Sequence, residues 1–135
     1  MRTRHRGALG RAGEDLAAAH LVAGGLDVIE RNWRDGRRGE IDIVAWDPRS
    51  RTVVVCEVKT RIGTRFGTAL EAVGADKLRQ LRRLARAWLA AHDTHGRVRF
   101  DVVAVTVPWV PGEEAEPDAG RWADARLEWV QGVHP

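Results

Sequence analysis

The chain has 135 residues, 44% of them hydrophobic and 30% charged, which is enough for one domain with a buried core and too few for two. No run approaches the roughly 18 apolar residues of a membrane-spanning helix. The single cysteine, Cys56, excludes an internal disulfide, so we expect a protein of a reducing compartment, the cytoplasm.

The formal net charge of +3 is unevenly distributed along the chain. Residues 1–100 carry twenty Lys and Arg against twelve Asp and Glu, whereas residues 101–135 carry two against seven. A basic body suits a polyanionic partner such as nucleic acid, and the alternative is a charged surface that is merely solvated. We expect one domain over 1–135, with its core at about 8–107 and an acidic loop and tail at 108–135.

The first predicted element is a helix at 8–23, rich in alanine and leucine and ended by a Gly-Gly pair. One of its faces carries small and apolar residues at helical spacing, namely Gly10, Ala17 and Leu21. Glu14 lies among them, so we expect its side chain to point inward, unlike that of the neighbouring Asp15.

Alternating and β-branched runs separated by turn signals predict three strands, at 26–33, 40–46 and 52–60. The remaining predicted elements are, in chain order, a short helical turn at 68–71, a helix at 75–91, a strand at 97–107, a loose acidic loop at 108–120 and a short strand at 126–131. Short turns make the first three strands an antiparallel meander, and the long helix permits a parallel crossover to the fourth. We therefore expect an α/β fold, a mixed sheet flanked by helices in the order helix-strand-strand-strand-helix-strand.

The second and third strands are expected to bring acidic side chains together. If the chain folds back around Pro48 and Arg49, residue 47 faces 50 and residue 40 faces 57. One face of the hairpin then carries the charged residues Glu40, Asp42, Glu57 and Lys59. The other face carries the apolar residues Ile41, Ile43, Val54, Cys56 and Val58. A register shift of one residue would destroy this arrangement.

Three carboxylates and a lysine on one sheet face are costly unless something pairs them, and a hard divalent cation does so. Mg²⁺ (or Mn²⁺) prefers a few carboxylate oxygens, so Asp42 and Glu57 are the expected ligands. The ion would activate a water and offset charge on a phosphate oxygen. Lys59 would orient that water or stabilise the developing charge. Taken alone, the Glu57-Val58-Lys59 segment also fits a solvated ion pair.

Arginines are frequent around these strands. Those expected to hold a nucleic-acid backbone beside the site are Arg37, Arg38, Arg61 and Arg65. The predicted helix at 75–91 carries, opposite its apolar stripe, a basic stripe made of Arg79, Arg82, Arg83 and Arg86. That stripe fits either a solvated helix face or a phosphate-binding track, for which Arg79 and Arg83 are the candidates.

Four segments, GRAGEDLAAAHL, RNWRDGRRGEIDIVAWD, VVVCEVKTR and VRFDVVAV, together span residues 10–105 and resemble the YraN-like family of small bacterial proteins. That family is similar to the restriction-endonuclease-like superfamily, and in particular to archaeal Holliday-junction resolvases. The resemblance implies a core of helix, three strands, helix and strand, which is the order predicted above.

The resemblance also implies roles for individual residues. Asp42 matches the metal-binding aspartate of the superfamily, and Glu57 and Lys59 match the acidic residue and the lysine of its Glu-X-Lys element. Glu14 matches an acidic residue of the first helix that often completes the metal site. One departure is Ile41, which stands where the superfamily's motif has proline.

Three accessory positions are weaker candidates. Gln80, or Lys77 one turn earlier, matches a polar position sometimes found on the second helix of the superfamily. Glu40 shares the predicted face of Asp42 and is the third accessory candidate.

Three functions remain open from the sequence. The first is a metal-dependent endonuclease that hydrolyses phosphodiester bonds in DNA, in repair or recombination. Because there is no separate sequence-reading domain, it would select DNA by shape, such as branches or junctions, which suits a homodimer with two sites. The second is a non-catalytic nucleic-acid-binding module on a nuclease fold. The third is a protein-interaction domain that uses the tryptophan-bearing tail.

Overall fold

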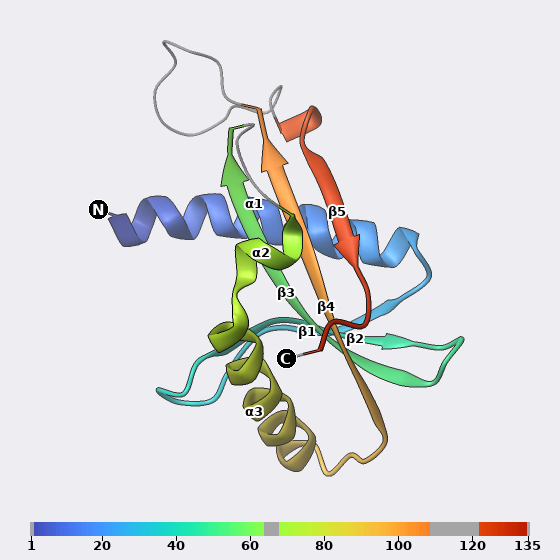
Figure 1. Cartoon of the computed structure of the whole chain (residues 1–135). Helices are drawn as coiled ribbons and strands as arrows, with labels where there is room; N and C mark the ends of the chain where they lie inside the picture. Colours follow the sequence, from blue (N-terminus) through green and yellow to red (C-terminus); the bar gives the residue numbers. More distant parts are fainter. Residues whose placement is uncertain (1, 64–67, 109–121, 135) are drawn as a thin grey trace.

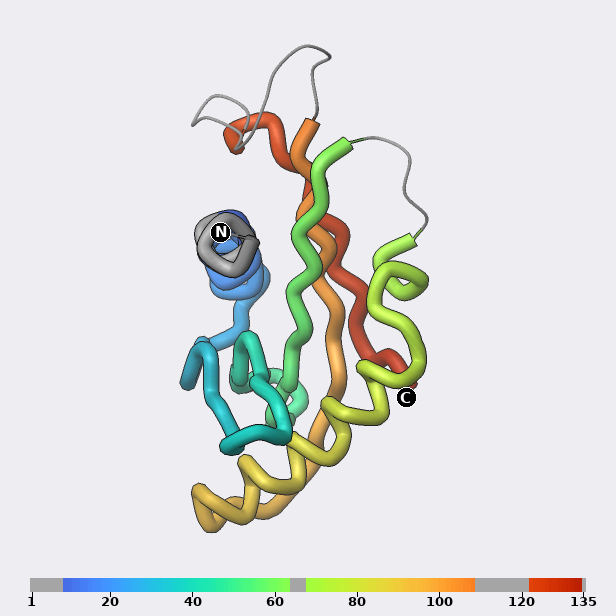
Figure 2. Tube along the Cα trace, turned by 90° about the vertical axis from the view of Figure 1, so that its left-hand side faces the viewer, coloured from blue at the N-terminus to red at the C-terminus, as the bar shows by residue number. Residues whose placement is uncertain are grey.

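The computed structural model describes residues 2–63, 68–108 and 122–134. Its helices and strands are, in chain order, α1 (Arg2–Ala23), β1 (Asp27–Arg34), β2 (Glu40–Asp47), β3 (Thr52–Ile62), α2 (Ala69–Val73), α3 (Ala75–Ala91), β4 (Arg97–Val107) and β5 (Arg126–Val130). They form three layers, in which α1 covers one face of a central sheet and α2 and α3 cover the other (Figures 1 and 2).

The sheet has the strand order β1-β2-β3-β4-β5. β1, β2 and β3 pair antiparallel as a meander, β3 and β4 pair parallel, and β5 pairs antiparallel with β4 at the far edge. The predicted α/β fold with a mixed sheet and the predicted order of elements are therefore confirmed. α1 begins six residues earlier than predicted, whereas α3 and β4 have the predicted bounds. The acidic loop predicted at 108–120 lies, apart from Pro108, outside the described residues.

The predicted register between β2 and β3 is wrong by two residues. Asp47 pairs with Thr52 and Ile43 with Cys56, whereas a chain reversal around Pro48 and Arg49 required residue 47 to face residue 50. The turn is longer because it includes Ser50 and Arg51, and Arg51 has a φ of 53°. A two-residue shift keeps the side-chain alternation of a strand, so the faces of most residues do not change.

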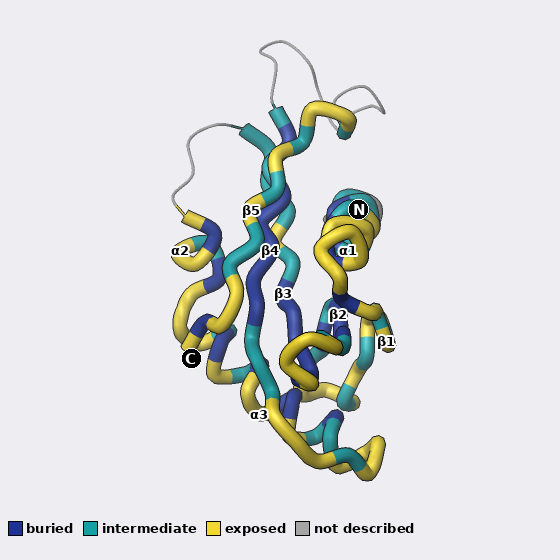
Figure 3. Tube along the Cα trace, turned by 90° about the vertical axis from the view of Figure 1, so that its right-hand side faces the viewer, coloured by how far each residue is buried: buried dark blue, intermediate teal, exposed yellow. Residues whose placement is uncertain are grey.

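Two apolar cores lie on the two faces of the sheet. On the α1 side, Ala17 and Leu21 of the helix pack with the buried strand residues Ile43, Ala45, Val54, Cys56, Val103 and Val105. On the other side, the predicted apolar stripe of α3 packs with the buried strand residues Ile41, Val44, Val53, Val55, Val102 and Ala104. The central strands β3 and β4 are buried along much of their length (Figure 3), since a strand covered on both faces needs apolar residues on both.

Among the helices in the described part of the chain, none has the length and apolar character needed to cross a lipid bilayer.

Gly13 allows α1 to lie close against β3. A Cβ atom added at Gly13 would lie 1.8 Å from Oγ1 of Thr60, whereas one added at Gly10, in the preceding turn, would have nothing within 4 Å. Thr60 is β-branched and has little rotamer freedom to move aside. We therefore expect Gly13→Ala to lower the free energy of unfolding by about 1–3 kcal/mol through overpacking, as measured by urea denaturation.

Gly10→Ala is the matched control for this prediction. It adds the same methyl group to the same helix without a clash, so it should raise the free energy of unfolding by up to about 1 kcal/mol through helix propensity alone. If the two variants changed stability in the same direction, the close approach at Gly13 would not matter.

Candidate metal centre

The candidate site lies where β2 and β3 stop pairing. The last pair of residues on this ladder is Ile43 and Cys56. Beyond it, Oδ2 of Asp42 accepts a hydrogen bond of 2.8 Å from the backbone N–H of Val58. A side-chain carboxylate thus replaces the backbone acceptor that a continuing strand would offer, which satisfies the N–H group. This exchange holds the Asp42 carboxylate between the two strands.

Three carboxylates from two elements gather around this point. Glu14 of α1 and Glu40 and Asp42 of β2 each offer an oxygen, and these oxygens lie within 4.8 Å of one another. As predicted, Glu14 points inward: its side chain is 12% exposed, against 68% for Asp15. Negative charges this close repel one another unless a cation or donors lie between them.

Asn32 of β1 supplies such donors. Its Nδ2 donates to Oε1 of Glu14 at 2.8 Å and to Oε1 of Glu40 at 3.0 Å. The φ of Asn32 is 55°, in the left-handed region that asparagine tolerates better than most residues. Arg31, the residue before it, pairs with Asp15 at 2.8 Å and lies 3.7 Å from Glu14. β1 therefore offsets part of the negative charge on α1 and β2.

Glu57 of β3 adjoins this cluster from the other face of the sheet. Its Oε2 lies 3.8 Å from Nζ of Lys77 on α3, and its Oε1 is buried without a hydrogen-bond partner. The residue is only 9% exposed. A buried carboxylate oxygen with no donor is unusual and calls for a ligand or a proton.

The prediction that Glu40, Asp42, Glu57 and Lys59 share one face of the sheet is wrong. Glu40 and Asp42 approach Glu14 of α1, whereas Glu57 approaches Lys77 of α3. The two neighbours of Asp42 on β2 explain the failure of this prediction. Ile41 belongs to the core beside α3, whereas Ile43 belongs to the core beside α1. Strict alternation would place both on one side, so β2 departs from it at Asp42. The acidic residues meet across the gap between the strands.

The pKa values reflect the crowding. Burial, and after it the neighbouring Asp42, raise the pKa of Glu57 to about 8. Burial also raises the pKa of Asp42, and burial together with Asp42 raises the pKa of Glu14. The charged forms of these carboxyl groups are thus disfavoured when no cation is present.

Both lysines of the chain lie near Glu57. In a chain with twenty arginines, the only lysines are Lys59 and Lys77, and each of them lowers the pKa of Glu57 through its charge. Lys59 is exposed on β3, and the side chain of Lys77 is 37% exposed. A lysine is a compact point charge on a flexible stem, unlike the planar, bidentate guanidinium of arginine.

The residues present fit a hard divalent cation. Every candidate donor in the cluster is a carboxylate oxygen, the ligand type that Mg²⁺ and Mn²⁺ prefer. Glu14, Glu40 and Asp42 are close enough to share one ion, and the unpartnered Oε1 of Glu57 lies beside Asp42. Glu40, an accessory candidate from the sequence, is thereby one of the three carboxylates, and Glu57 is their neighbour.

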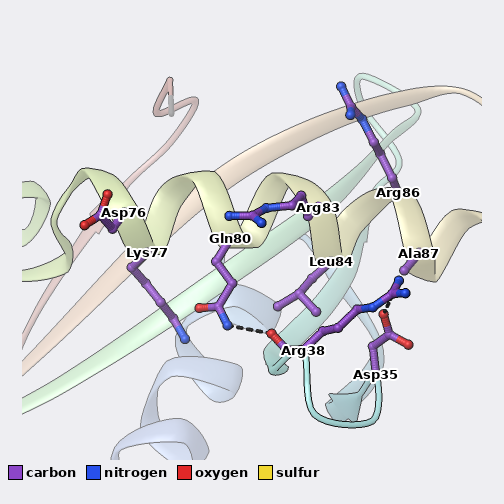
Figure 4. Close-up of a pocket in the computed structure, with 9 residues that line it drawn as sticks. All are labelled: Asp35, Arg38, Asp76, Lys77, Gln80, Arg83, Leu84, Arg86 and Ala87. Atoms are coloured by element: carbon purple, nitrogen blue, oxygen red, sulfur yellow. Dashed lines mark hydrogen bonds and ion pairs between the residues drawn. The ribbon is translucent and has the colours of Figure 1, made fainter.

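A groove of about 940 Å³ opens next to the carboxylates, between α3 and the turn that joins β1 to β2. Figure 4 shows Lys77, Gln80 and Leu84 pointing from α3 toward the side on which Arg38 and Asp35 lie. Nε2 of Gln80 donates to the carbonyl oxygen of Arg38 at 2.7 Å. Gln80 therefore holds the turn in place, whereas Lys77 reaches the site.

The predicted nucleic-acid-binding arginines are dispersed. Arg38 and Arg83 line the groove, and Arg37 is exposed on the same turn. Arg79 instead pairs with Asp76, and Arg61 lies near the end of β3, where its Nε donates to Thr106. Arg65 lies outside the described residues.

Three residues in contact with the cluster were missed by the sequence analysis: Asn32, Arg31, and Arg34, whose Nη2 lies 3.0 Å from Oε2 of Glu40. Asn32 had a usable signal, because asparagine is depleted in strands and stands here within a predicted one. Arg31 had none, since its contacts depend on how α1 crosses β1.

The family model for the uncharacterised protein family UPF0102 matches residues 13–105. A UPF0102 protein of Frankia casuarinae is 53% identical over 106 residues, covering 78% of this chain and 87% of the relative. One of Streptomyces coelicolor is 53% identical over 105 residues, covering 76% and 79%. One of Mycobacterium sp. (strain KMS) is 49% identical over 119 residues, covering 87% and 84%. The chain belongs to the UPF0102 family, and its resemblance to the YraN-like proteins is thereby confirmed.

Proposed function

We propose that this protein is a cytoplasmic, divalent-metal-dependent endonuclease that hydrolyses phosphodiester bonds in branched or junction DNA. The observation that carries the proposal is the meeting of four acidic side chains from three elements, Glu14, Glu40, Asp42 and Glu57, with both lysines of the chain beside them. Such a cluster costs stability without a ligand, and perturbed carboxyl groups of this kind concentrate at functional sites.

The acidic residues would hold Mg²⁺ or Mn²⁺, with Asp42 at the centre because it adjoins both Glu14 and Glu57. When bound, the ion would supply Lewis-acid chemistry, offsetting charge on the phosphate and easing deprotonation of the attacking water. Asn32 and Arg31 keep Glu14 and Glu40 in position through the contacts described above. The hydrogen bond from Val58 fixes the orientation of Asp42.

Lys59 would act on the substrate rather than on the ion. It is exposed, and it follows Glu57 by two residues on the same strand. An ammonium group beside the bound phosphate would stabilise the charge that develops on its oxygens.

A magnesium titration by calorimetry, together with cleavage of a four-way junction and of a linear duplex, tests the proposal. We expect the wild type to bind Mg²⁺ and to cut the junction, with EDTA abolishing the cutting. The variant Asp42→Asn should lose both properties. Because Glu57, with a pKa of about 8, must give up its proton to the solvent, the Mg²⁺ affinity should increase as the pH rises through that value.

Equal Mg²⁺ binding and equal cutting by the wild type and Asp42→Asn would refute the proposal. DNA binding without cutting of any substrate, and unchanged in Asp42→Asn, would instead support a non-catalytic nucleic-acid-binding module. Asp15→Asn is the matched control, because Asp15 neighbours Glu14 but its side chain is 68% exposed and is not one of the clustered carboxylates.

A further inference from the structure

We propose that the groove between α3 and the β1–β2 turn binds the sugar–phosphate backbone of one DNA strand where it leaves the metal centre. This inference rests on the proposed nuclease function and names the surface that holds the substrate. The groove begins at Lys77, whose Nζ lies 3.8 Å from Oε2 of Glu57. Lys77 therefore belongs both to the groove and to the surroundings of Glu57.

The charge of the groove favours a polyanion. Its lining includes four cationic side chains, Arg38, Lys77, Arg83 and Arg86, and two acidic ones, Asp35 and Asp76. Each acid is already paired, Asp35 with Arg38 at 3.6 Å and Asp76 with Arg79, which lies outside the lining. Arg83 and Arg86 make no ion pair with any residue that the structure describes. They are available to bind phosphates.

The two walls of the groove are held at a fixed separation. Gln80 of α3 bonds to the carbonyl oxygen of Arg38 at 2.7 Å. Gly39 has a φ of 132°, and a Cβ atom added there would lie 2.4 Å from Nε2 of Gln80. A glycine is thus required for this close contact. A binding surface whose walls are already in place loses less entropy when the ligand binds.

The lining also indicates which part of the nucleic acid is bound. None of the nine residues that line the groove is aromatic, so it offers no platform on which bases could stack. Guanidinium and ammonium groups bind phosphates without reading the sequence. From Lys77 to Ala87 the helix rises about 15 Å, which is long enough for a few successive phosphates of one strand.

The side chains differ in how they face the groove. Figure 4 shows Arg83 lying along α3 above Gln80, and Arg86 extending away from the β1–β2 turn. Arg83 is therefore the main expected phosphate contact, and Arg38, on the opposite wall and 3.6 Å from Asp35, is a secondary one. Arg82, the neighbour of Arg83, is also exposed but lines a separate hollow with Val98, Phe100 and Gly132.

Fluorescence anisotropy with a labelled four-way junction in EDTA tests the groove without cleavage. We expect Arg83→Glu to weaken binding about tenfold and to lower the slope of log affinity against log salt by about one. The double variant Arg38→Glu/Arg83→Glu should lose more. Arg82→Glu carries the same charge change on the adjacent residue of the same helix and should bind nearly as the wild type does.

Equal losses in Arg82→Glu and Arg83→Glu would overturn the inference, because only net charge would then matter. So would normal DNA binding by Arg83→Glu, or the absence of wild-type binding at low salt. The milder Arg83→Gln, with its thermal unfolding checked by circular dichroism, guards against a folding defect. Groove-dependent binding by a protein that cuts no DNA would leave the groove established while refuting the nuclease proposal, so the two failures are distinguishable.

Discussion

In the variant Lys59→Met, we expect the cleavage rate of junction DNA to fall about 100- to 1000-fold, the usual cost of losing one preorganised charge that stabilises a transition state. Mg²⁺ binding should be retained, because Lys59 is exposed, offers no oxygen ligand, and lowers the pKa of Glu57 less than Lys77 does. Single-turnover cleavage and calorimetry on the same preparation separate the two properties.

Lys77→Met is the matched control, since it removes the only other lysine of the chain. Nζ of Lys77 lies near Glu57, where a positive charge competes with a divalent cation. Its loss should therefore strengthen Mg²⁺ binding and weaken DNA binding, with a smaller effect on the chemical step than Lys59→Met. Equal losses of cleavage rate in the two variants would contradict a specific role for Lys59.

The fold was largely predictable because local signals agreed with the tertiary structure. The apolar stripe of α3, Leu78, Leu81, Ala85 and Trp88, is buried as its spacing predicted. The run from Val53 to Cys56 is buried on alternating sides, as a central strand requires. The predicted register around Pro48 and Arg49 was wrong because Arg51, with its positive φ, extends the turn. No residue pattern in the sequence predicts the longer turn.

The site was predictable in its members and not in its geometry. Asp42 and Glu57 are neighbours, as the hairpin indicated, and Glu14 approaches Asp42 from α1. Strand alternation placed all the acidic residues on one face, but the end of β2–β3 pairing at Ile43 and Cys56 lets Asp42 turn into the gap. The hydrogen bond that Asp42 then accepts joins it to Val58, sixteen residues along the chain, and a strand pattern does not show such a contact.

Asp101→Ala should lower the free energy of unfolding by about 3–5 kcal/mol, more than Gly13→Ala does, because it removes one partner of a buried ion pair. Asp101 is fully buried on β4. Its oxygens accept from Nε and Nη2 of Arg99 at 2.9 and 3.0 Å, from Nε1 of Trp129 at 2.9 Å and from the backbone N–H of Gly132 at 3.0 Å. Asp101 therefore forms an ion pair with Arg99.

The predicted loss is large because Asp101 connects several parts of the fold at one point. Trp129 lies on β5 and Gly132 on the segment after it, while Nη1 of Arg99 reaches Asp47 at the end of β2, at 2.9 Å. Without the carboxylate, Nε and Nη2 of Arg99, whose side chain is only 20% exposed, and two further donors lose their acceptor. Urea denaturation at pH 7 measures the effect.

Two control variants have smaller expected effects on the free energy of unfolding. Trp129→Phe removes one hydrogen bond and should cost about 1 kcal/mol from that bond. Asp15→Ala breaks an exposed ion pair and should cost at most about 1 kcal/mol. A loss of stability in Asp101→Ala no greater than in Asp15→Ala would contradict this account of how β5 and the C-terminal segment are held to the sheet.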